Sequence, residues 1–512
     1  MARSKSHESH WLVWGQRSPV LVAGFALLSA VACGDDGGSG SGSGGSAGAG
    51  ATGASGGSSA NGGSTNGGST SGGSTSGGSS SGGTSGAGNG GTTVGGAGGS
   101  GAGPGTTLDE RIETHDLTLP EGVQAGVSNW RIWGRGSLNV APVFTVPRGN
   151  CSTLVCYTTQ AGTAKVAEVG RDGSLIATRD LAQDRQCRGL AAEPDGAYAA
   201  LLWDDAGDRI FLQRYAADGS ERGTPTELTN SDNKPDDFGI GESRLEYGDG
   251  RYGAYYHVHS DSGHEGDTLK WIDAQSGAET TGWGWGCSHS MSNLLRFNPS
   301  SKQFMPVCVT DCYPGTSGDF STQSQGGVFL NHNKGKVIDV DAGCNGSVAG
   351  ELGGAAIAPD GFKLVWNSHQ AAMTKGQQSY DENAMNQDIG FSAITGTTTA
   401  GAVVWLTNTP NVDEADSGIA RFSPADSSQE QYLVGWAEPG NSYKYRLALL
   451  GPDGSFLEGP IDVSSSVAWG RRDDPFRADV NGDVVWSWFD APGSATLHVA
   501  RVVSGSDQSC SP

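Results

Sequence analysis

The chain has 512 residues, of which 84 are glycine, and its formal net charge is −23. Because most of the glycine is concentrated near the N-terminus, about 400 residues are left to fold, which is enough for a large core. A surface this acidic repels phosphate backbones and excludes nucleic acids as partners. It suits metal cations, basic partners or neutral sugars. Alternatively, the acidic charge only keeps a secreted protein soluble.

Residues 1–32 have the pattern of a secretory signal peptide. Arg3, Lys5 and Arg17 form a basic region, and an apolar run follows from Pro19 to Ala32. The run is shorter than the about 20 residues that a helix needs to cross the hydrocarbon core of a bilayer. We therefore expect this segment to direct export and to be removed.

The signal ends at a cysteine that is a candidate for lipidation. Small residues stand directly before Cys33, in the order Ala30-Val31-Ala32. This junction resembles the lipobox of bacterial lipoproteins, which implies cleavage before Cys33 and a lipid on that residue. Ala30 stands where the family usually has leucine, so ordinary signal cleavage is the alternative.

Residues 33–107 form a low-complexity segment of glycine, serine, threonine, alanine and asparagine. Such a segment has almost no apolar side chains to bury, so we expect a disordered tether. The 74 residues from Gly34 to Thr107 give a root-mean-square reach of about 45–50 Å. Anchor and tether together resemble the architecture of Gram-negative surface lipoproteins, and the membrane is expected to be touched only through the N-terminal lipid.

From residue 108 onward, short apolar or alternating runs follow turn signals, as in β-hairpins. One kind of turn recurs seven times along the chain, at residues 147–149, 194–196, 248–250, 298–300, 359–361, 424–426 and 480–482. A second kind of turn occurs six times, each time after one of these runs, at residues 171–173, 217–219, 275–277, 333–335, 394–396 and 452–454. The first kind repeats about every 55 residues, and such internal repeats are typical of propeller blades.

Residues 108–512 thus resemble β-propellers in general, although no motif of a specific propeller family is present. We predict an all-β fold: a single propeller of seven blades, each with four antiparallel strands, named A to D outward from the axis. Six or eight blades, or a β-sandwich, are the alternatives. The last unit lacks a D strand, and Arg111–Leu119 resembles the D strands Ser220–Thr229 and Ser455–Val463, so we expect it to complete the last blade and close the ring.

The two faces of such a propeller differ in chemistry here. The A–B and C–D turns share one face, called the turn face below, and they are short. The B–C and D–A loops share the opposite, long-loop face, which collects the long segments: 229–243, 257–267, 283–291, 309–327, 343–352, 367–388 and 467–474. Since loops on rigid scaffolds carry function, we expect the binding face there, although long loops can also be merely tolerated.

One stretch of the long-loop face carries candidate metal ligands. The histidines are His257, His259, His264 and His289, and the carboxylates are Asp261, Glu265 and Asp267. His257 and His259 are two residues apart on an expected strand and therefore project to the same side. Imidazoles with carboxylates suit zinc, and the carboxylates alone suit calcium. The alternative is a polar loop held by hydrogen bonds.

A second pattern on the same face pairs tryptophans with carboxylates. The residues are Trp133, Trp285 and Trp469, with Asp236 and Asp237 in a neighbouring loop. Tryptophan rings beside carboxylates can bind sugars, but packing between blades is the alternative that we favour, since tryptophan buries a large area.

Apart from Cys33, the chain has eight cysteines, and an even number in an exported chain favours disulfides. Cys151 and Cys510 fall at the turn face at opposite ends of the ring, where a bond would lock its closure. Sequence alone does not fix the pairing, and the expected bonds are Cys151–Cys510, Cys156–Cys187, Cys308–Cys312 and Cys287–Cys344.

These observations favour an exported, lipid-anchored binding module that is monomeric. It would contact a glycan, peptide or other surface component at the outer membrane or cell surface, or in the periplasm. The alternative is a glycan-active or metal-dependent hydrolase or lyase, with calcium or zinc as the candidate cation. The acidic loops offer catalytic candidates that no spacing singles out: Asp232, Asp236, Asp237, Asp261, Glu265, Asp267, Asp473 and Asp474.

Overall fold

The computed structural model describes most of the chain after residue 106. The described residues are 107–126, 143–229, 243–259, 265–283, 287, 292–313, 325–332, 334–340, 351–368, 386–424, 428–440, 442–469, 474–506 and 510. They belong to one compact unit, Thr92–Pro512.

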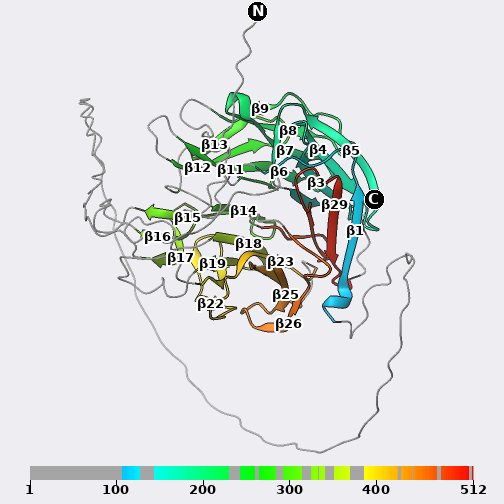
Figure 1. Cartoon of the computed structure of the whole chain (residues 1–512). Helices are drawn as coiled ribbons and strands as arrows, with labels where there is room; N and C mark the ends of the chain where they lie inside the picture. Colours follow the sequence, from blue (N-terminus) through cyan, green and yellow to red (C-terminus); the bar gives the residue numbers. More distant parts are fainter. Residues whose placement is uncertain are drawn as a thin grey trace, which may run out of the picture. The chain divides into compact units, whose positions relative to one another are not determined.

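The strands form seven antiparallel sheets in sequence order (Figure 1). Blade 1 has β2 (Phe144–Pro147), β3 (Thr153–Thr158), β4 (Ala164–Val169) and β5 (Leu175–Ala182). Blade 2 has β6 (Gln186–Ala192), β7 (Tyr198–Asp204), β8 (Arg209–Tyr215) and β9 (Thr226–Glu227). Blade 3 has β10 (Ser243–Gly248), β11 (Arg251–His259), β12 (Glu265–Asp273) and β13 (Glu279–Trp283). Two 3-10 turns accompany them, η1 (Asp109–Arg111) before β1 and η2 (Asp205–Gly207) between β7 and β8.

The remaining blades repeat the pattern. Blade 4 has β14 (Ser292–Asn298), β15 (Gln303–Tyr313), β16 (Gln325–Leu330) and β17 (Gly335–Val340). Blade 5 has β18 (Glu351–Ala358), β19 (Gly361–Ser368), β20 (Asp388–Thr395) and β21 (Thr399–Ala400), and β22 (Val404–Trp405) also pairs with β20. Blade 6 has β23 (Ala415–Arg421), β24 (Tyr432–Glu438), β25 (Lys444–Leu450) and β26 (Phe456–Asp462). Blade 7 has β27 (Arg477–Ala478), β28 (Val484–Trp488), β29 (Thr496–Val502) and β1 (Ile112–Thr118).

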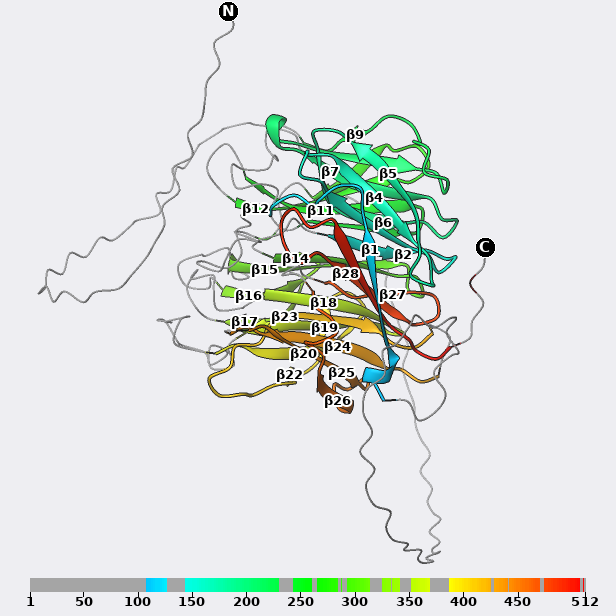
Figure 2. The ribbon, with the colours of Figure 1, turned by 45° about the vertical axis from the view of Figure 1, so that its right-hand side comes forward.

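The N-terminal strand closes the ring, as the sequence predicted. Strand β1 runs antiparallel to β29, with Ile112 opposite Val502 and Thr118 opposite Thr496. Figures 1 and 2 show the two strands, from opposite ends of the chain, side by side. The seven-bladed, four-stranded ring is therefore confirmed, and the pairing removes two open sheet edges.

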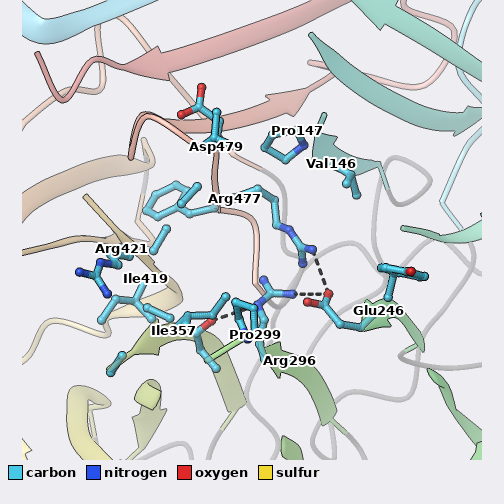
Figure 3. Close-up of a pocket in the computed structure, with 18 of the residues that line it drawn as sticks. Val146, Pro147, Glu246, Arg296, Pro299, Ile357, Ile419, Arg421, Arg477 and Asp479 are labelled. Atoms are coloured by element: carbon cyan, nitrogen blue, oxygen red, sulfur yellow. Dashed lines mark hydrogen bonds and ion pairs between the residues drawn. The ribbon is translucent and has the colours of Figure 1, made fainter. Parts of the chain in front are cut away.

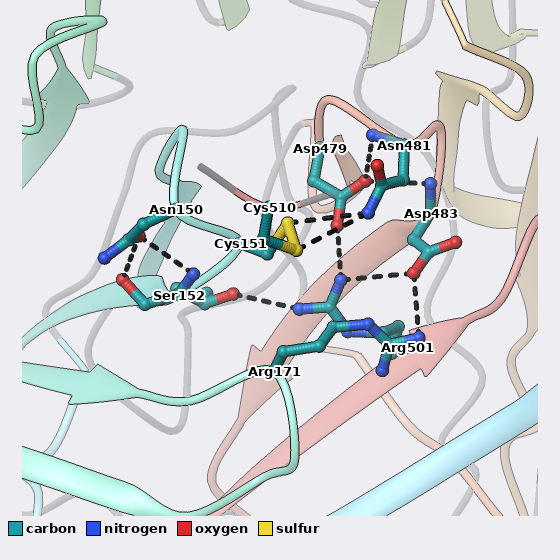
Figure 4. The surroundings of a disulfide bond; sticks show 10 residues. Asn150, Cys151, Ser152, Arg171, Asp479, Asn481, Asp483, Arg501 and Cys510 are labelled. Carbon is teal, nitrogen blue, oxygen red and sulfur yellow. Dashed lines mark hydrogen bonds and ion pairs between the residues drawn. A yellow bond between two sulfur atoms is a disulfide. The ribbon is translucent and has the colours of Figure 1, made fainter. Parts of the chain in front are cut away.

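A disulfide locks the same seam at the turn face (Figure 4). It joins Cys151 to Cys510 across 359 residues, with the Cα atoms 5.4 Å apart, a distance that suits a disulfide. The side chain of Asn481 donates to both sulfurs, at 3.4 Å to Cys151 and 3.7 Å to Cys510. Beneath it, Arg501 Nη1 lies 2.5 Å from Asp479 Oδ2. Closure thus rests on a covalent bond and a strand pair.

The core lies between neighbouring blades rather than in one centre. In one cluster, Leu201 and Leu212 of blade 2 pack against Tyr252 and Tyr256 of blade 3. The outermost strand of blade 6, β26, contributes little to the core, because it is largely exposed. Each blade is therefore stabilised mainly by the apolar surface that it buries against its neighbours.

Arginines also link blades at the turn face. Arg148 of blade 1 is buried, and its Nη2 donates to the carbonyl oxygens of Gly196 at 2.6 Å and Ala217 at 3.0 Å in two turns of blade 2. Arg214 of blade 2 likewise donates to carbonyl oxygens in the turn at residues 274–276 of blade 3. Tight glycine turns make this approach possible: Gly196 has a φ of +88°, where a side chain would be strained.

Candidate functional site

A pocket of about 380 Å³ opens at the turn face, around the ring axis (Figure 3). The innermost strands of several blades form its walls, together with the A–B turns that follow them. Much of the wall is alanine, because β6 contributes Ala191 and Ala192 and β18 contributes Ala355, Ala356 and Ala358. These short side chains leave space where larger ones would meet.

Charged side chains from opposite sides of the ring meet in this pocket. Glu246 stands on β10 of blade 3, Arg296 on β14 of blade 4, and Arg477 on β27 of blade 7. Glu246 Oε2 lies 2.9 Å from Arg477 Nη2 and 3.3 Å from Arg296 Nη1. Because blades 3 and 7 are not neighbours in the ring, the Glu246–Arg477 pair crosses the axis, as Figure 3 shows.

Asp474, directly before β27, completes the cluster. It forms an ion pair with Arg296, and its Oδ2 lies 3.5 Å from Arg477 Nη1. Its approach depends on Gly353 and Gly354 of β18: the Asp474 amide donates to the Gly353 carbonyl, and a Cβ added to Gly354 would lie 3.2 Å from Asp474 Oδ1. Asp474 is one of the acidic loop residues that the sequence analysis named as catalytic candidates. In the structure it forms ion pairs with arginines.

Both carboxyl groups of the cluster are buried. Burial raises the pKa of Glu246 to about 7, against the opposing effect of Arg296. Burial likewise raises the pKa of Asp474 to about 7, opposed by Arg296 and then by Arg244. Near neutral pH, protonation of either carboxyl group would leave the guanidinium groups with excess positive charge.

Two further charged residues line the pocket. Asp479 is engaged by Arg501 and by the backbone amides of Asn481 at 2.9 Å and Asp483 at 3.0 Å. Arg421, at the end of β23, is buried, and its guanidinium donates only long hydrogen bonds, from Nε to Ser423 Oγ at 3.4 Å and from Nη2 to the Pro424 carbonyl at 3.3 Å. In the part of the chain that the structure describes, Arg421 forms no ion pair.

The sequence analysis did not find this pocket, but a signal for it exists. Glu246 and Arg296 each interrupt an apolar strand, in Leu245-Glu246-Tyr247 and Leu294-Leu295-Arg296-Phe297. A charge inside a strand that is otherwise buried requires a partner. Two such strands of opposite charge in successive blades point to an ion pair near the axis.

The predicted metal ligands are described only in part. His257 is buried on β11 opposite Asp267 on β12, and His259 is opposite Glu265 in the same strand pair. The side chains of His259 and Glu265, and all of Asp261, His264 and His289, lie outside the described residues. A calcium or zinc site at this stretch therefore stays a prediction.

Asp267 has a structural role in the described part of this stretch. Tyr255 donates its hydroxyl to Asp267 Oδ2, and the Cys287 amide donates to Oδ1 at 2.8 Å. Burial raises the pKa of Asp267 to about 7. Asp267, Cys287 and Cys308 lie close enough to share a metal ion, but a disulfide joins the two sulfurs, so they are not available as thiolate ligands.

That disulfide corrects one part of the predicted pairing. The structure contains the expected bonds Cys151–Cys510 and Cys156–Cys187, but it joins Cys287 to Cys308. The expected bonds Cys308–Cys312 and Cys287–Cys344 are therefore wrong. Strand β15 continues through Tyr313, and four residues of extended strand span about 13 Å, too far for the Cα atoms of a disulfide. Cys344 lies outside the described residues.

Among the predicted sugar-binding residues, the structure describes Trp469. It is buried, its indole Nε1 donates to the Asp416 carbonyl at 2.8 Å, and its ring packs 4.6 Å from that of Tyr445 and 5.2 Å from that of Phe476. These contacts join blades 6 and 7, so Trp469 has no ring face open to a sugar. Trp133, Trp285, Asp236 and Asp237 lie outside the described residues, as does Cys33.

The closed ring of seven four-stranded blades defines a β-propeller. No protein-family model and no curated protein matches the sequence. Similar solved structures include the Pan2 WD40 domain of Neurospora crassa (10% identity, 70% of this chain and 89% of that chain covered, TM-score 0.37), the Dos1 propeller (8%, 75% and 93%, TM-score 0.41) and AofleA of Arthrobotrys oligospora (12%, 72% and 93%, TM-score 0.36). Within the described residues, no helix is long and apolar enough to cross a membrane.

Proposed function

We propose that this protein is an exported, tethered binding module in which the propeller is the rigid scaffold of the ligand site. The observation that carries the proposal is the pocket at the ring axis, where apolar walls enclose a few charged groups from opposite blades. An apolar pocket with a few convergent polar groups is the usual form of a ligand site. Ring closure by β1 and by Cys151–Cys510 supports it, because both hold the walls of the pocket in place.

The cysteine pairs support export. Three pairs lie at bonding positions, with Cα–Cα distances of 5.4, 6.2 and 6.5 Å. Such bonds persist in oxidising compartments. Together with the signal pattern of residues 1–32, they favour cleavage at Cys33, a lipid on that residue, and display by the tether of residues 33–107 at the outer membrane or cell surface, or in the periplasm.

The long-loop face is the second part of the proposal. We propose that it contacts a glycan, a peptide or another surface component, because it collects the long segments of the sequence. A binder gains more from a long tether than an enzyme that acts on diffusible substrates. In the described residues, Asp267 serves the fold through Tyr255 and Cys287, which does not favour the hydrolase alternative.

Labelling with a radioactive fatty acid tests the anchor. The full-length chain is expressed in a Gram-negative host beside the variant Cys33→Ala, and membrane and soluble fractions are compared. We expect label and membrane association in the parent only. Protease treatment of intact cells then separates surface display from the periplasm. Equal label in both proteins, or none in either, would contradict lipidation at Cys33.

Binding to glycan and peptide arrays tests the module itself. The full-length Cys33→Ala protein is applied at several salt concentrations. Saturable binding to one class of ligand supports the proposal. Absence of binding on both arrays, together with hydrolysis of an arrayed glycan, would favour the enzyme.

A further inference from the structure

The charge of the turn-face pocket differs from that of the chain. The chain carries −23, yet the pocket walls hold the three arginines Arg296, Arg421 and Arg477 against the two carboxylates Glu246 and Asp479. Asp479 is occupied by Arg501, which does not line the pocket. The wall therefore has residual positive charge in an acidic protein, and an anion is the complementary ligand.

Arg421 is the guanidinium that carries this residual charge. Glu246 and Asp474 compensate Arg296 and Arg477, whereas Arg421 forms no ion pair among the described residues. Its two printed hydrogen bonds are long, use Nε and Nη2, and leave Nη1 free for another acceptor. Figure 3 shows Arg421 beside Ile419, on the other side of the pocket from the Arg477–Glu246 pair.

The rest of the wall selects against a strongly hydrated anion. Ile357 and Ile419 lie on the same side of the pocket as Arg421 (Figure 3), and Ala356 and Phe476 also line the pocket. A phosphate dianion would bring more charge than one guanidinium compensates, and it would lose its hydration against these apolar side chains. A carboxylate brings one charge, fits the planar fork of an arginine, and can be attached to an apolar group that fills the remaining space.

We propose that the turn-face pocket binds a carboxylate attached to a compact apolar group, with the anion held by Arg421 and the apolar group packed against Ile357, Ile419 and Phe476. This inference rests on the proposed binding function and names the ligand class of one of its sites. The same chemistry occurs in a free acylated amino acid and at the C-terminus of a polypeptide with an apolar last residue.

Calorimetry with two matched probes tests the proposal. The full-length Cys33→Ala protein is titrated with N-acetyl-leucine and with its neutral amide. We expect N-acetyl-leucine to bind and its amide to bind at least about tenfold more weakly, because a hydrogen bond to a charged group contributes about 1.5–3 kcal/mol. Equal affinity for both probes, or no binding of N-acetyl-leucine, would overturn the proposal.

Variants assign the binding to this pocket. Arg421→Gln should weaken binding of N-acetyl-leucine at least tenfold, and Ala356→Leu should weaken both probes by filling the pocket. The matched control is Arg446→Gln, in the same blade, whose guanidinium lies 2.8 Å from Glu438 and does not line the pocket. It should bind as the parent does. If Arg421→Gln does not fold, the Ala356→Leu variant tests the proposal. Unchanged binding of N-acetyl-leucine to Ala356→Leu would show that the ligand binds elsewhere and would overturn the proposal.

Peptides separate the two sources of the carboxylate. A decapeptide ending in leucine is tested with a free and with an amidated C-terminus. Binding of the free peptide as tight as that of N-acetyl-leucine points to polypeptide ends, and binding of N-acetyl-leucine alone points to small acids. Failure of all carboxylates, with array binding retained, would refute this ligand class and leave the binding module standing.

Discussion

Arg477 and Glu246 meet across the axis of the ring, with Nη2 and Oε2 2.9 Å apart, although 231 residues separate them in sequence. The pair ties blade 7 to blade 3, which are not neighbours. Contacts between adjacent blades are plentiful in this fold, but a direct link between opposite blades restrains the width of the pocket. The ion cluster therefore has a structural effect that can be measured apart from ligand binding.

Removing Glu246 should cost more stability than removing its partner. Glu246→Ala leaves Arg296 and Arg477 to share Asp474, and an uncompensated buried charge costs about 3–5 kcal/mol. Arg477→Ala should cost less, because Arg296 still compensates Glu246. Urea denaturation measures the free energy of unfolding of each variant. The double variant Glu246→Ala/Arg477→Ala should lose about 1–3 kcal/mol less of it than the two single variants lose together.

The partly exposed pair Arg446–Glu438 provides the comparison for this cycle. Its side chains are 25% and 20% exposed, and exposed pairs contribute at most about 1 kcal/mol. A cross-axis pair whose coupling energy is no larger than this would not hold the pocket together.

The two long-range disulfides should differ in their contribution to stability. Cys151–Cys510 joins residues that are 359 positions apart and so closes a long loop, whereas Cys156–Cys187 joins residues that are 31 positions apart. In the chain-entropy relation, the longer loop gives about 2 kcal/mol more stabilisation of the folded state. Urea denaturation of Cys151→Ala/Cys510→Ala and of Cys156→Ala/Cys187→Ala measures this difference. Equal losses would mean that constraint of the unfolded chain is not the main effect.

Peptide mapping without reduction should recover Cys287 joined to Cys308. Strand β15 holds Cys308 in an extended segment beside β14, so a bond to Cys312 would require that strand to bend back. A recovered Cys308–Cys312 peptide would show that β15 ends earlier than the structure has it.

Asp267 should make the stability of the protein depend on pH in an unusual direction. Its folded carboxyl group keeps a proton up to about pH 7, whereas an unfolded aspartate loses it near pH 4. Between these values the folded state binds more protons, so stability falls as the pH rises. Asp267→Asn does not titrate, so its stability relative to the parent should rise by about 1–3 kcal/mol between pH 5 and pH 8.

Asp273 is the matched control for this experiment. Its side chain is partly exposed, and its carboxylate accepts hydrogen bonds from the side chain and then the amide of Ser276, which lower its pKa. The stability from this group is present above the unfolded pKa and is lost only at lower pH. The difference in the free energy of unfolding between Asp273→Asn and the parent should therefore stay constant between pH 5 and pH 8. A similar slope in both variants would assign the effect to another group.

Removal of β1 should make the protein aggregate. A chain that starts at residue 120 lacks the strand that pairs with β29, which leaves an open sheet edge and the buried Leu117 contact unfilled. A chain that starts at residue 107 keeps the strand. Light scattering after size exclusion should find a monomer for the longer chain and oligomers for the shorter. Two monomers of equal thermal stability would contradict closure by β1.

The blade number and the ring closure could be predicted because both depend on local signals. Each A–B turn carries a compact motif such as Pro194-Asp195-Gly196, and the resemblance of Arg111–Leu119 to D strands is visible in the sequence. The positions of Cys151 and Cys510 within the repeat placed them at one seam. Repeats make such inferences robust, because every blade offers an independent reading of the same pattern.

The pocket could not be predicted in the same way. Its ion cluster joins Glu246, Arg296 and Arg477, which come from three blades and have no fixed spacing. Only the three-dimensional ring decides which blades face each other across the axis. The wrong partner of Cys308 has a different origin: the sequence predicts a loop from residue 309, whereas β15 continues as an extended strand through Tyr313.

The order in which the ring is made follows from its closure. Strand β1 is among the first folded segments to be synthesised, yet its partner β29 comes near the end, and Asp116 contacts His498 only after 382 further residues. Contacts this distant in sequence form slowly. Six blades can form from contacts between neighbouring segments, while β1 stays unpaired until β29 joins it. Until these two strands pair, the ring keeps two open sheet edges, so aggregation through those edges is the main risk while this protein folds.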